Sequence, residues 1–138
     1  MRPGKPLTFG RVASEGGERL FFGLPGNPVS SMVTFELFVR PALRRMGGYR
    51  VPERPRVTAR ALAPIDNPGS RPGYLRVRLE SIPGGLGARP TGEQGSGILR
   101  SMLLADGLAV LSGDTKVPAG GEVEVILLLS DEALSAQR

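Results

Sequence analysis

The sequence contains no cysteine, no histidine and no tryptophan among its 138 residues. Without thiol or imidazole groups, the chain cannot build a zinc finger, a thiolate metal site, a haem ligand set, a Ser–His–Asp triad or a cysteine nucleophile. No disulfide can form, so a cytoplasmic location is the simplest expectation. No apolar stretch reaches the roughly 20 residues of a membrane-spanning helix, and the first six residues lack the apolar core of a signal peptide. We therefore expect a soluble protein with no membrane partner.

Glycine and proline are abundant instead, with 20 and 13 copies. Because hydrophobic residues still make up 40% of the chain, we interpret this content as turns between short strands and not as disorder. The charge is unevenly spread: residues 1–60 carry a net charge of +7 and residues 61–138 a net charge of −2. This asymmetry indicates two parts, the first of which faces an anion or an acidic partner. A composition bias is the alternative, since arginine outnumbers lysine 16 to 2.

Residues 1–48 have the pattern of an incomplete α/β unit. We expect a short strand at residues 7–10, a buried apolar strand at residues 19–24 and a helix at residues 28–46, where apolar side chains recur every three or four positions. That helix is apolar nearly all round, and such a helix needs neighbours on several sides. Because two strands cannot supply them, the α/β part looks incomplete at its N-terminus.

The predicted helix has clear start and stop signals. Asn27 suits the N-cap position, and Pro28 suits the first turn, where the missing proline N–H is not needed. Gly47 follows the last turn and can end the helix. Pro41 lies inside the helix and should kink or split it near Val39, because proline removes a backbone donor.

A predicted domain boundary lies at residues 49–56. Two prolines and three arginines in these eight residues favour an extended, solvated linker. Beyond it, residues 57–130 contain strand-like runs separated by turns, which is typical of a small all-β barrel or sandwich. The clearest runs are at residues 56–63, 74–80, 107–111 and 122–129. Residues 131–138 would form a polar tail.

Polarity alternates strictly in the run at residues 74–80. The side chains of Leu75, Val77 and Leu79 would face the interior, and those of Tyr74, Arg76, Arg78 and Glu80 would face outward. Further along, Ser96 would cap a short helix that ends near Leu103. The remaining acidic candidates are interpreted as turn residues: Asp66, Asp106 and Asp114.

The junction between the second strand and the helix, at residues 24–31, is the strongest candidate site. Backbone N–H groups and the positive end of the helix dipole suit phosphate or another oxyanion, and Gly26 lets a ligand approach the backbone closely. Ser30 and Ser31 add hydroxyl donors. A tight turn with a well-capped helix explains the same residues equally well. The glycine-rich run at residues 91–97 is a weaker anion site, for which a plain turn is the simpler interpretation.

The most distinctive motif is Leu-Pro-Gly-Asn-Pro-Val-Ser at residues 24–30, which follows Arg-Pro-Gly-Lys-Pro-Leu at residues 2–7. Residues 35–41, 91–102 and 104–108 add further matches in the same order. Together these segments resemble the MoeA family of molybdopterin molybdenumtransferases, which also includes the E domain of gephyrin. The resemblance covers almost the whole chain.

The resemblance implies both a fold and a reaction. The fold would be an α/β fragment, the end of a molybdopterin-binding MogA-like domain, followed by a small all-β barrel-like domain. The family inserts molybdate at the dithiolene sulfurs of adenylated molybdopterin and releases AMP, with a divalent cation that is usually Mg²⁺. It works as a homodimer, in which the cleft joins the α/β domain to the β-domain of the partner subunit.

Carried over position by position, the resemblance implies that the substrate-binding residues are Arg2, Lys5, Pro25, Gly26, Asn27, Pro28, Ser30, Arg76 and Ser96. Arg2 replaces a lysine of the family, but it can still pair with phosphate or molybdate. On the β-domain, Arg71 or Arg78 is an alternative to Arg76 as the residue that faces the cleft. We expect no metal ligand or catalytic residue within this chain, because the family's acidic residues would lie upstream of Met1.

We therefore expect that the chain alone has no transferase activity and acts with a missing N-terminal half or in a homodimer. A non-catalytic scaffold or peptide-binding module of the gephyrin E-domain type is the alternative. Nucleic-acid binding is not expected despite the net charge of +5. Barrels that bind single strands use several stacking aromatics, and Tyr74 is the one evident on a strand face that we expect to be exposed.

Overall fold

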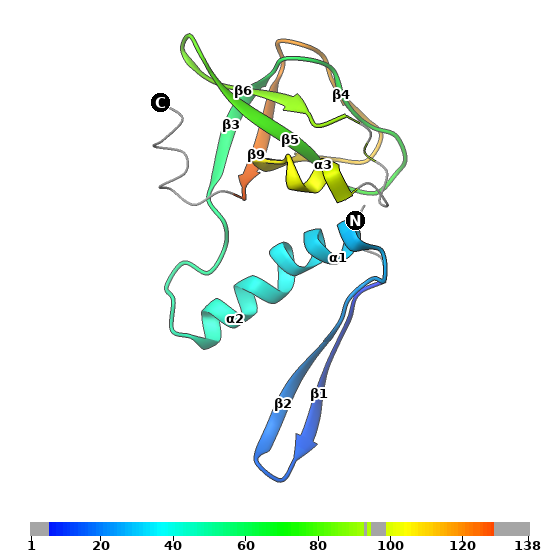
Figure 1. Ribbon diagram of the computed structural model, residues 1–138, viewed down its shortest axis with the longest axis vertical. Coiled ribbons are helices and arrows are strands. Elements are labelled where there is room, and N and C mark those ends of the chain that lie inside the picture. The colour runs from blue at the N-terminus through cyan, green and yellow to red at the C-terminus, as the bar shows by residue number, and fades with distance from the viewer. Residues whose placement is uncertain (1–5, 93, 95–98, 129–138) are drawn as a thin grey trace.

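The computed structural model describes residues 6–92, 94 and 99–128 of the chain. A β-hairpin, a long helix and a β-barrel follow one another along the long axis of the molecule (Figure 1). The hairpin projects at one end and the barrel forms the other end. Within the ranges just given, no helix has both the length and the apolar character needed to cross a membrane.

The first two strands, β1 (Thr8–Ser14) and β2 (Gly17–Gly23), form an antiparallel hairpin. Phe9 and Phe22 pack against each other across it, with ring centroids 5.0 Å apart, yet Phe9 is still 59% exposed. The strand predicted at residues 19–24 therefore forms, but the prediction that it is buried is wrong. The physical reason is that the hairpin makes a sheet of its own and projects away from the barrel.

A continuous helical segment follows, made of α1 (Pro28–Thr34), the π-helical turn η1 (Phe35–Val39) and α2 (Arg40–Met46). Its ends agree with the predicted helix. The kink or split predicted near Val39 occurs as the π-helical turn η1. Its physical cause is Pro41, which has no N–H to donate to the preceding turn. The chain leaves the helix at Gly48, whose φ of +83° lies in the left-handed region that glycine adopts without strain.

The connection between the helix and the barrel lies against the helix. Arg54 makes a bidentate ion pair with Glu36, with Nε 2.9 Å from Oε2 and Nη2 3.2 Å from Oε1. Arg40 Nη1 donates to the carbonyl of Pro52 at 3.3 Å, and its Nε lies 3.8 Å from Glu36 Oε2. We call these four residues the linker clamp. Most of the predicted linker is solvent-exposed, as expected, but Pro52 is buried and Arg54 is half-buried because the helix supplies partners for them.

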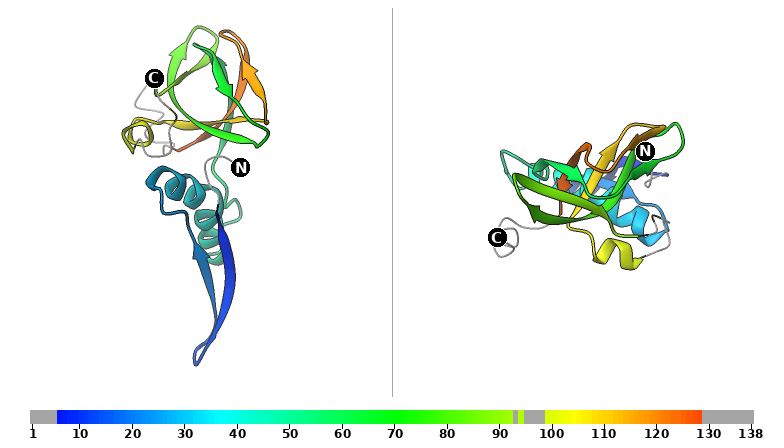
Figure 2. Two further views of the ribbon diagram at one scale, coloured as in Figure 1. Left: turned by 90° about the vertical axis from the view of Figure 1, so that its right-hand side faces the viewer. Right: turned by 90° about the horizontal axis from the view of Figure 1, so that it is seen from above.

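Five strands form a closed barrel at the other end of the molecule (Figure 2). They are β3 (Arg56–Ala61), β5 (Gly73–Ile82), β6 (Gly85–Pro90), β7 (Gly107–Leu111) and β9 (Glu122–Leu127). The order around the barrel is β3, β6, β5, β7, β9, and the pairing of β9 with β3 closes it. Every neighbouring pair is antiparallel except β3 and β6. The predicted small barrel-like domain is confirmed.

The sequence pattern does not predict three of the strands. Two of them, β4 (Ile65–Asn67) and β8 (Thr115–Val117), pair with each other, and three residues are too few to show a period. Asp66, which we interpreted as a turn residue, lies in β4 opposite Lys116. The third, β6, contains two glycines and a proline, residues that are depleted in strands.

The barrel interior is filled by small and branched side chains. On β5, Leu75, Val77 and Leu79 face inward as predicted. The neighbouring strands add Ala59, Ala61, Ala88, Ala109, Leu111, Val123, Val125 and Leu127. The many alanines fit the narrow space that five strands enclose.

Part of the barrel is also covered on its outer face. We call this contact the outer cluster, and its buried members are Val29, Val33, Met102, Leu108 and Ile126. They come from α1, from the short helix α3 (Leu99–Leu103), and from the outer faces of β7 and β9. The apolar runs of β7 and β9 do not alternate because both of their faces are covered. The outer cluster thus joins the long helix to the barrel, and Figure 2 shows α1 and α3 side by side there.

Candidate functional site

The loop that the sequence singles out connects β2 to α1. Pro25 is buried, Gly26 is exposed and Asn27 is half-buried. Asn27 is the N-cap residue as predicted, with φ −71° and ψ 128°, and its carbonyl accepts a hydrogen bond from the N–H of Ser31 at 2.9 Å. Its side chain makes no capping hydrogen bond, and Pro28 occupies the first turn. The loop therefore presents an exposed glycine directly before the helix.

The two serines after this loop have different surroundings. Ser30 is only 6% exposed, and its carbonyl accepts a hydrogen bond from the Oγ1 of the buried Thr34 at 2.6 Å. Ser31 is half-buried and borders a cavity. Of these two hydroxyls, the one that a ligand can reach in this structure is that of Ser31.

A cavity of about 280 Å³ lies where the long helix faces α3. It is lined by Leu24, Ser31, Met32, Phe35, Glu36 and Met102. Most of this lining is apolar, and the polar side chains are those of Ser31 and Glu36. A mainly apolar pocket with few polar groups is typical of sites for small organic ligands or for a partner's side chain.

Arg76 lies on the outer face of β5, as predicted, but it is not exposed. Its side chain is only 1% exposed, and its Nε donates to the Oγ of Ser101 in α3 at 3.1 Å. Burial lowers the pKa of the Arg76 guanidinium, which still remains charged because arginine does not lose its proton in proteins. The expectation of an exposed outward arginine is wrong here because α3 packs over this part of the strand. Arg71 and Arg78 are exposed.

The backbone of Arg76 is held by a side-chain amide. Gln94 Oε1 accepts from the Arg76 N–H at 2.8 Å, and Gln94 Nε2 donates to the Arg76 carbonyl at 3.1 Å. The same carbonyl accepts from the N–H of Thr91 at 3.1 Å. The pairing of β5 with β6 ends at Pro90, so Gln94 takes the place of a strand partner just beyond it. Sequence reasoning did not single out Gln94, because a side chain that mimics a strand leaves no periodic signal.

The other predicted site residues, Arg2, Lys5 and Ser96, lie outside the residues that the structure describes. Among the described residues, the loop at residues 25–28, Ser31 and Met102 come together around the cavity and the start of α1. Arg76 does not line the cavity itself. It contacts Ser101 of α3, the helix that contributes Met102 to the cavity wall.

The described part of the chain contains no group of three or more acidic side chains that could hold a metal ion. Glu36, the acidic residue at the cavity, is already paired with Arg54 and Arg40. These residues do not fit a magnesium site, so we assign no chemical step to a metal ion here.

Comparison with known proteins finds a family model for the barrel and another for the N-terminal part of the chain. The family model described as MoeA C-terminal region (domain IV) matches residues 58–128, which include the whole barrel after the first two residues of β3. The chain belongs to the MoeA family. A second family model, described as probable molybdopterin binding domain, matches residues 1–45.

Named relatives agree with the MoeA assignment. Molybdopterin molybdenumtransferase 1 of Mycobacterium tuberculosis is 37% identical over 136 residues, which cover 93% of this MoeA-family chain and 31% of that protein. The molybdenum cofactor synthesis protein cinnamon of Drosophila melanogaster is 38% identical over 127 residues, covering 89% of this chain and 20% of that one. Gephyrin of Dictyostelium discoideum is 37% identical over 131 residues, covering 80% and 18%.

A solved structure of a molybdopterin biosynthesis MoeA protein from Pyrococcus horikoshii has the same fold. It superimposes with a TM-score of 0.72 at 33% sequence identity, over 94% of this MoeA-family chain and 30% of that chain. The chain thus spans about a third or less of the length of the relatives that it matches. The α/β fragment and the β-barrel are those of MoeA proteins.

Proposed function

We propose that this chain serves molybdenum cofactor biosynthesis as the C-terminal portion of a longer or split molybdopterin molybdenumtransferase. In this proposal the complete enzyme inserts molybdate into adenylated molybdopterin and releases AMP. The observation that carries it is the order of the two family matches: a molybdopterin-binding segment at residues 1–45 precedes domain IV at residues 58–128 within one chain.

The exposed apolar surface supports a role as part of a larger assembly. Phe9 and Phe21 of the hairpin are 59% and 52% exposed, and the long helix exposes Phe35, Phe38 and Leu43. Phe9 pairs with Phe22 and Phe21 pairs with Gly10, so Phe9 and Phe21 lie on opposite faces of the hairpin. Apolar surface exposed on both faces of the hairpin and on the helix marks contact with another polypeptide. We propose that the remainder of a molybdopterin-binding domain covers it, in the same chain or in a separate one.

The site residues divide by the ligand groups that they suit. Arg2 and Lys5 would pair with phosphate or molybdate, because cations bind such anions through charge-assisted hydrogen bonds. Gly26 would allow the substrate to approach the backbone, between Pro25 and Asn27. Ser31 would add a hydroxyl at the cavity wall, a role for which it is better exposed than Ser30.

Three further features of the proposal rest on the family resemblance. The complete enzyme would use magnesium, with ligands that this chain does not supply. The working unit would be a homodimer, in which Ser96 and the barrel of one subunit complete the cleft of its partner. The location would be the cytoplasm.

The test is an assay of AMP release from adenylated molybdopterin after the addition of molybdate. We expect no turnover by the 138-residue chain alone. Turnover should appear when the chain is co-expressed with the upstream part of the Mycobacterium tuberculosis relative. Turnover by the isolated chain would contradict the need for a second part. A stable co-purified complex without any AMP release would contradict the transferase function, and would favour the alternative of a non-catalytic scaffold.

A further inference from the structure

We propose that Arg76 is a positioning residue, which holds α3 against β5 and thereby places Met102 at the cavity beside the start of α1. The physical coupling stands on the structure alone. Its importance for catalysis rests on the proposed function, because the cavity then belongs to the substrate cleft. The proposal differs from the expectation that Arg76 binds substrate directly.

The side chain of Arg76 is buried in the folded chain. A side chain that is 1% exposed presents almost no surface to a ligand. A buried guanidinium is costly unless it is hydrogen-bonded within the protein, and the Nε of Arg76 donates to Ser101 Oγ at 3.1 Å. Ser101 of α3 is therefore one of the groups that hold the Arg76 side chain.

The strand from which Arg76 extends is held on both sides. Its N–H and carbonyl are both engaged by the side chain of Gln94, and β7 pairs with the strand on the other side, with Arg76 opposite Leu108. Immediately after it, the Val77 carbonyl accepts a hydrogen bond from the N–H of Asp106 at 2.9 Å. The backbone of Arg76 is thus held in place, and the segment that follows α3 is hydrogen-bonded to β5.

Ser101 precedes a residue of α3 that lines the cavity. The next residue along α3 is Met102, which is 7% exposed, belongs to the outer cluster with Val29 and Val33, and lines the cavity together with Ser31. A shift of α3 would therefore move a wall of the cavity and release the first turn of α1. Arg78, two residues further along the same face of β5, is exposed and has no such place under α3.

The coupling can be measured on the 138-residue chain by amide hydrogen exchange resolved by NMR. Three amides report on the chain of contacts: Leu104, which donates to the Arg100 carbonyl, Ala105, which donates to that of Met102, and Ser31, which donates to that of Asn27. We expect Arg76→Met to accelerate exchange at all three by about tenfold, because the hydrogen bond between the guanidinium and Ser101 is lost. The paired amides of β3 and β9 should keep their rates.

Four further variants separate positioning from a general stabilising role. Ser101→Ala should accelerate exchange at the same three amides, and the double variant should show less than the sum of the two single effects, because the hydrogen bond between the two side chains can be lost only once. Arg76→Lys keeps a charged donor and should restore part of the protection. Arg78→Met is the matched control and should change nothing. If Arg76→Met does not fold, Ser101→Ala carries the test.

Three results would overturn the proposal. Faster exchange at Leu104 and Ala105 with an unchanged Ser31 would show that Arg76 holds α3 without affecting the start of α1. Equally faster exchange in β3 and β9 would show a role in barrel stability only. Unchanged rates in Ser101→Ala would show that the contact has no positioning effect. The AMP-release assay is independent of these measurements, so a failure of the proposed function is recognised separately.

Discussion

Two glycines have opposite surroundings, and the difference decides what an added methyl group would do. A Cβ on Gly26, in the exposed loop before α1, would meet nothing within 4 Å. A Cβ on Gly107, at the start of β7, would collide with the Cγ1 of Val125 and would lie 2.8 Å from the carbonyl oxygen of Ile126. One glycine is thus required by packing, and the other is available for a functional role.

We predict that Gly26→Ala leaves the fold unchanged and impairs the enzyme. If the substrate approaches the backbone at Gly26, the extra methyl group displaces it, and AMP release by the reconstituted enzyme should fall by about ten- to a hundredfold. The measurement is initial rate, with the thermal unfolding midpoint as a check of folding. Gly10→Ala, which adds a methyl group to another open position, should keep full activity. An undiminished rate in Gly26→Ala would show that the ligand does not approach this loop.

We predict that Gly107→Ala destabilises the barrel. Overpacking a filled interior costs about 1–3 kcal/mol, and here the clash involves a backbone carbonyl that cannot move away without disturbing β9. Urea unfolding measures the loss as a lower transition midpoint with an unchanged slope. Gly10→Ala in the hairpin is again the control. Equal midpoints for the two variants would mean that β7 has room for a side chain.

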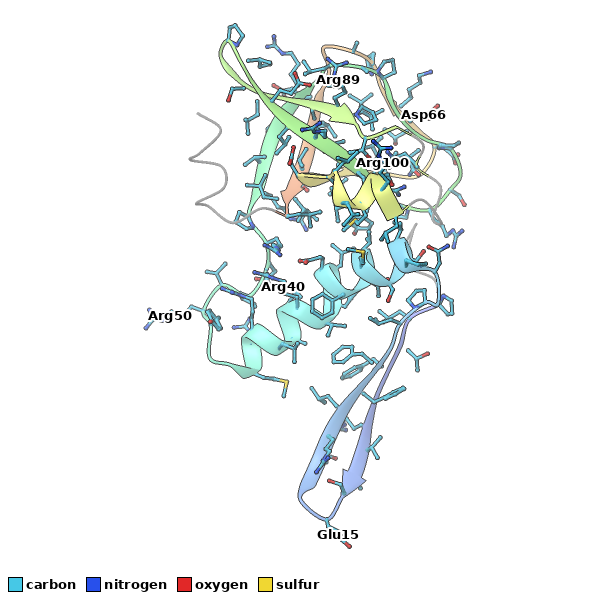
Figure 3. The ribbon with its side chains drawn as sticks, viewed as in Figure 1. Glu15, Arg40, Arg50, Asp66, Arg89 and Arg100 are labelled. Atoms are coloured by element: carbon cyan, nitrogen blue, oxygen red, sulfur yellow. The ribbon has the colours of Figure 1, made fainter. Side chains whose placement is uncertain are left out.

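At the scale of elements, the linker clamp determines how the helix continues into the barrel. Glu36, Arg40 and Arg54 each have side chains that are 18–20% exposed. Burial, and secondarily the charge of Arg54, lower the pKa of Arg40, whereas Glu36 opposes this shift. Figure 3 shows Arg40 on the helix facing the connection, and Arg50 at its outer bend. One carboxylate therefore holds two arginines that would otherwise repel each other.

We predict that Glu36→Gln loosens the connection without unfolding the barrel. The two guanidinium groups lose their shared counter-charge, and the local opening of residues 49–55 should become easier. Trypsin cleavage after Arg50, which is exposed, reports this opening and should become about tenfold faster. Glu18→Gln, which breaks the exposed pair with Arg11, should have no effect, because exposed pairs contribute little. Equal cleavage rates in Glu36→Gln and the parent chain would contradict the clamp.

The elements that could be predicted from sequence are those with a strong local signal. The helix at residues 28–46 has start and stop signals and a clear period, and the strands around residues 75 and 125 contain apolar residues at alternating or successive positions. The short strands β4 and β8 have too few residues for a period. β6 forms a strand because it pairs with β5 and β3 in the barrel. Local propensity carries no information of that kind.

The site was predictable to a similar extent. The loop at residues 25–28 could be predicted because proline and glycine residues interrupt regular structure there. The burial of Arg76 could not, because it depends on α3 folding back over β5. Alternation along one strand reports which way a side chain points, but not what covers that face. The contact with Ser101, 25 residues further along, is visible only in three dimensions.

At the scale of the whole molecule, the burial of apolar side chains is strongly uneven. The barrel encloses its apolar side chains completely, and the outer cluster covers one side of it. The far end of the long helix and both strands of the hairpin leave large apolar side chains exposed. In Figure 3 the tip of the hairpin, at Glu15, lies far from the barrel.

We predict that the isolated chain self-associates through the hairpin and that Phe21→Glu reduces the association. A charge on the apolar face makes its burial costly, while the barrel is too distant to be affected. Sedimentation velocity at a series of concentrations measures the association, and urea unfolding checks the barrel. Lys116→Gln, on the distant strand β8, lowers the net charge by the same one unit and is the control for the change in net charge. A parent chain that stays monomeric at all concentrations would contradict this prediction.

The barrel closes between its first and last strands, with Arg56 opposite Ile126. During synthesis, β3 leaves the ribosome long before its partner β9 exists, so one edge of the nascent sheet stays open until nearly the whole domain has emerged. Contacts between such distant positions form slowly, and unpaired edges favour aggregation in the meantime. Translation speed through the codons between β3 and β9, and the chaperones that bind nascent chains, should therefore influence the yield of this protein more than substitutions in its hairpin do.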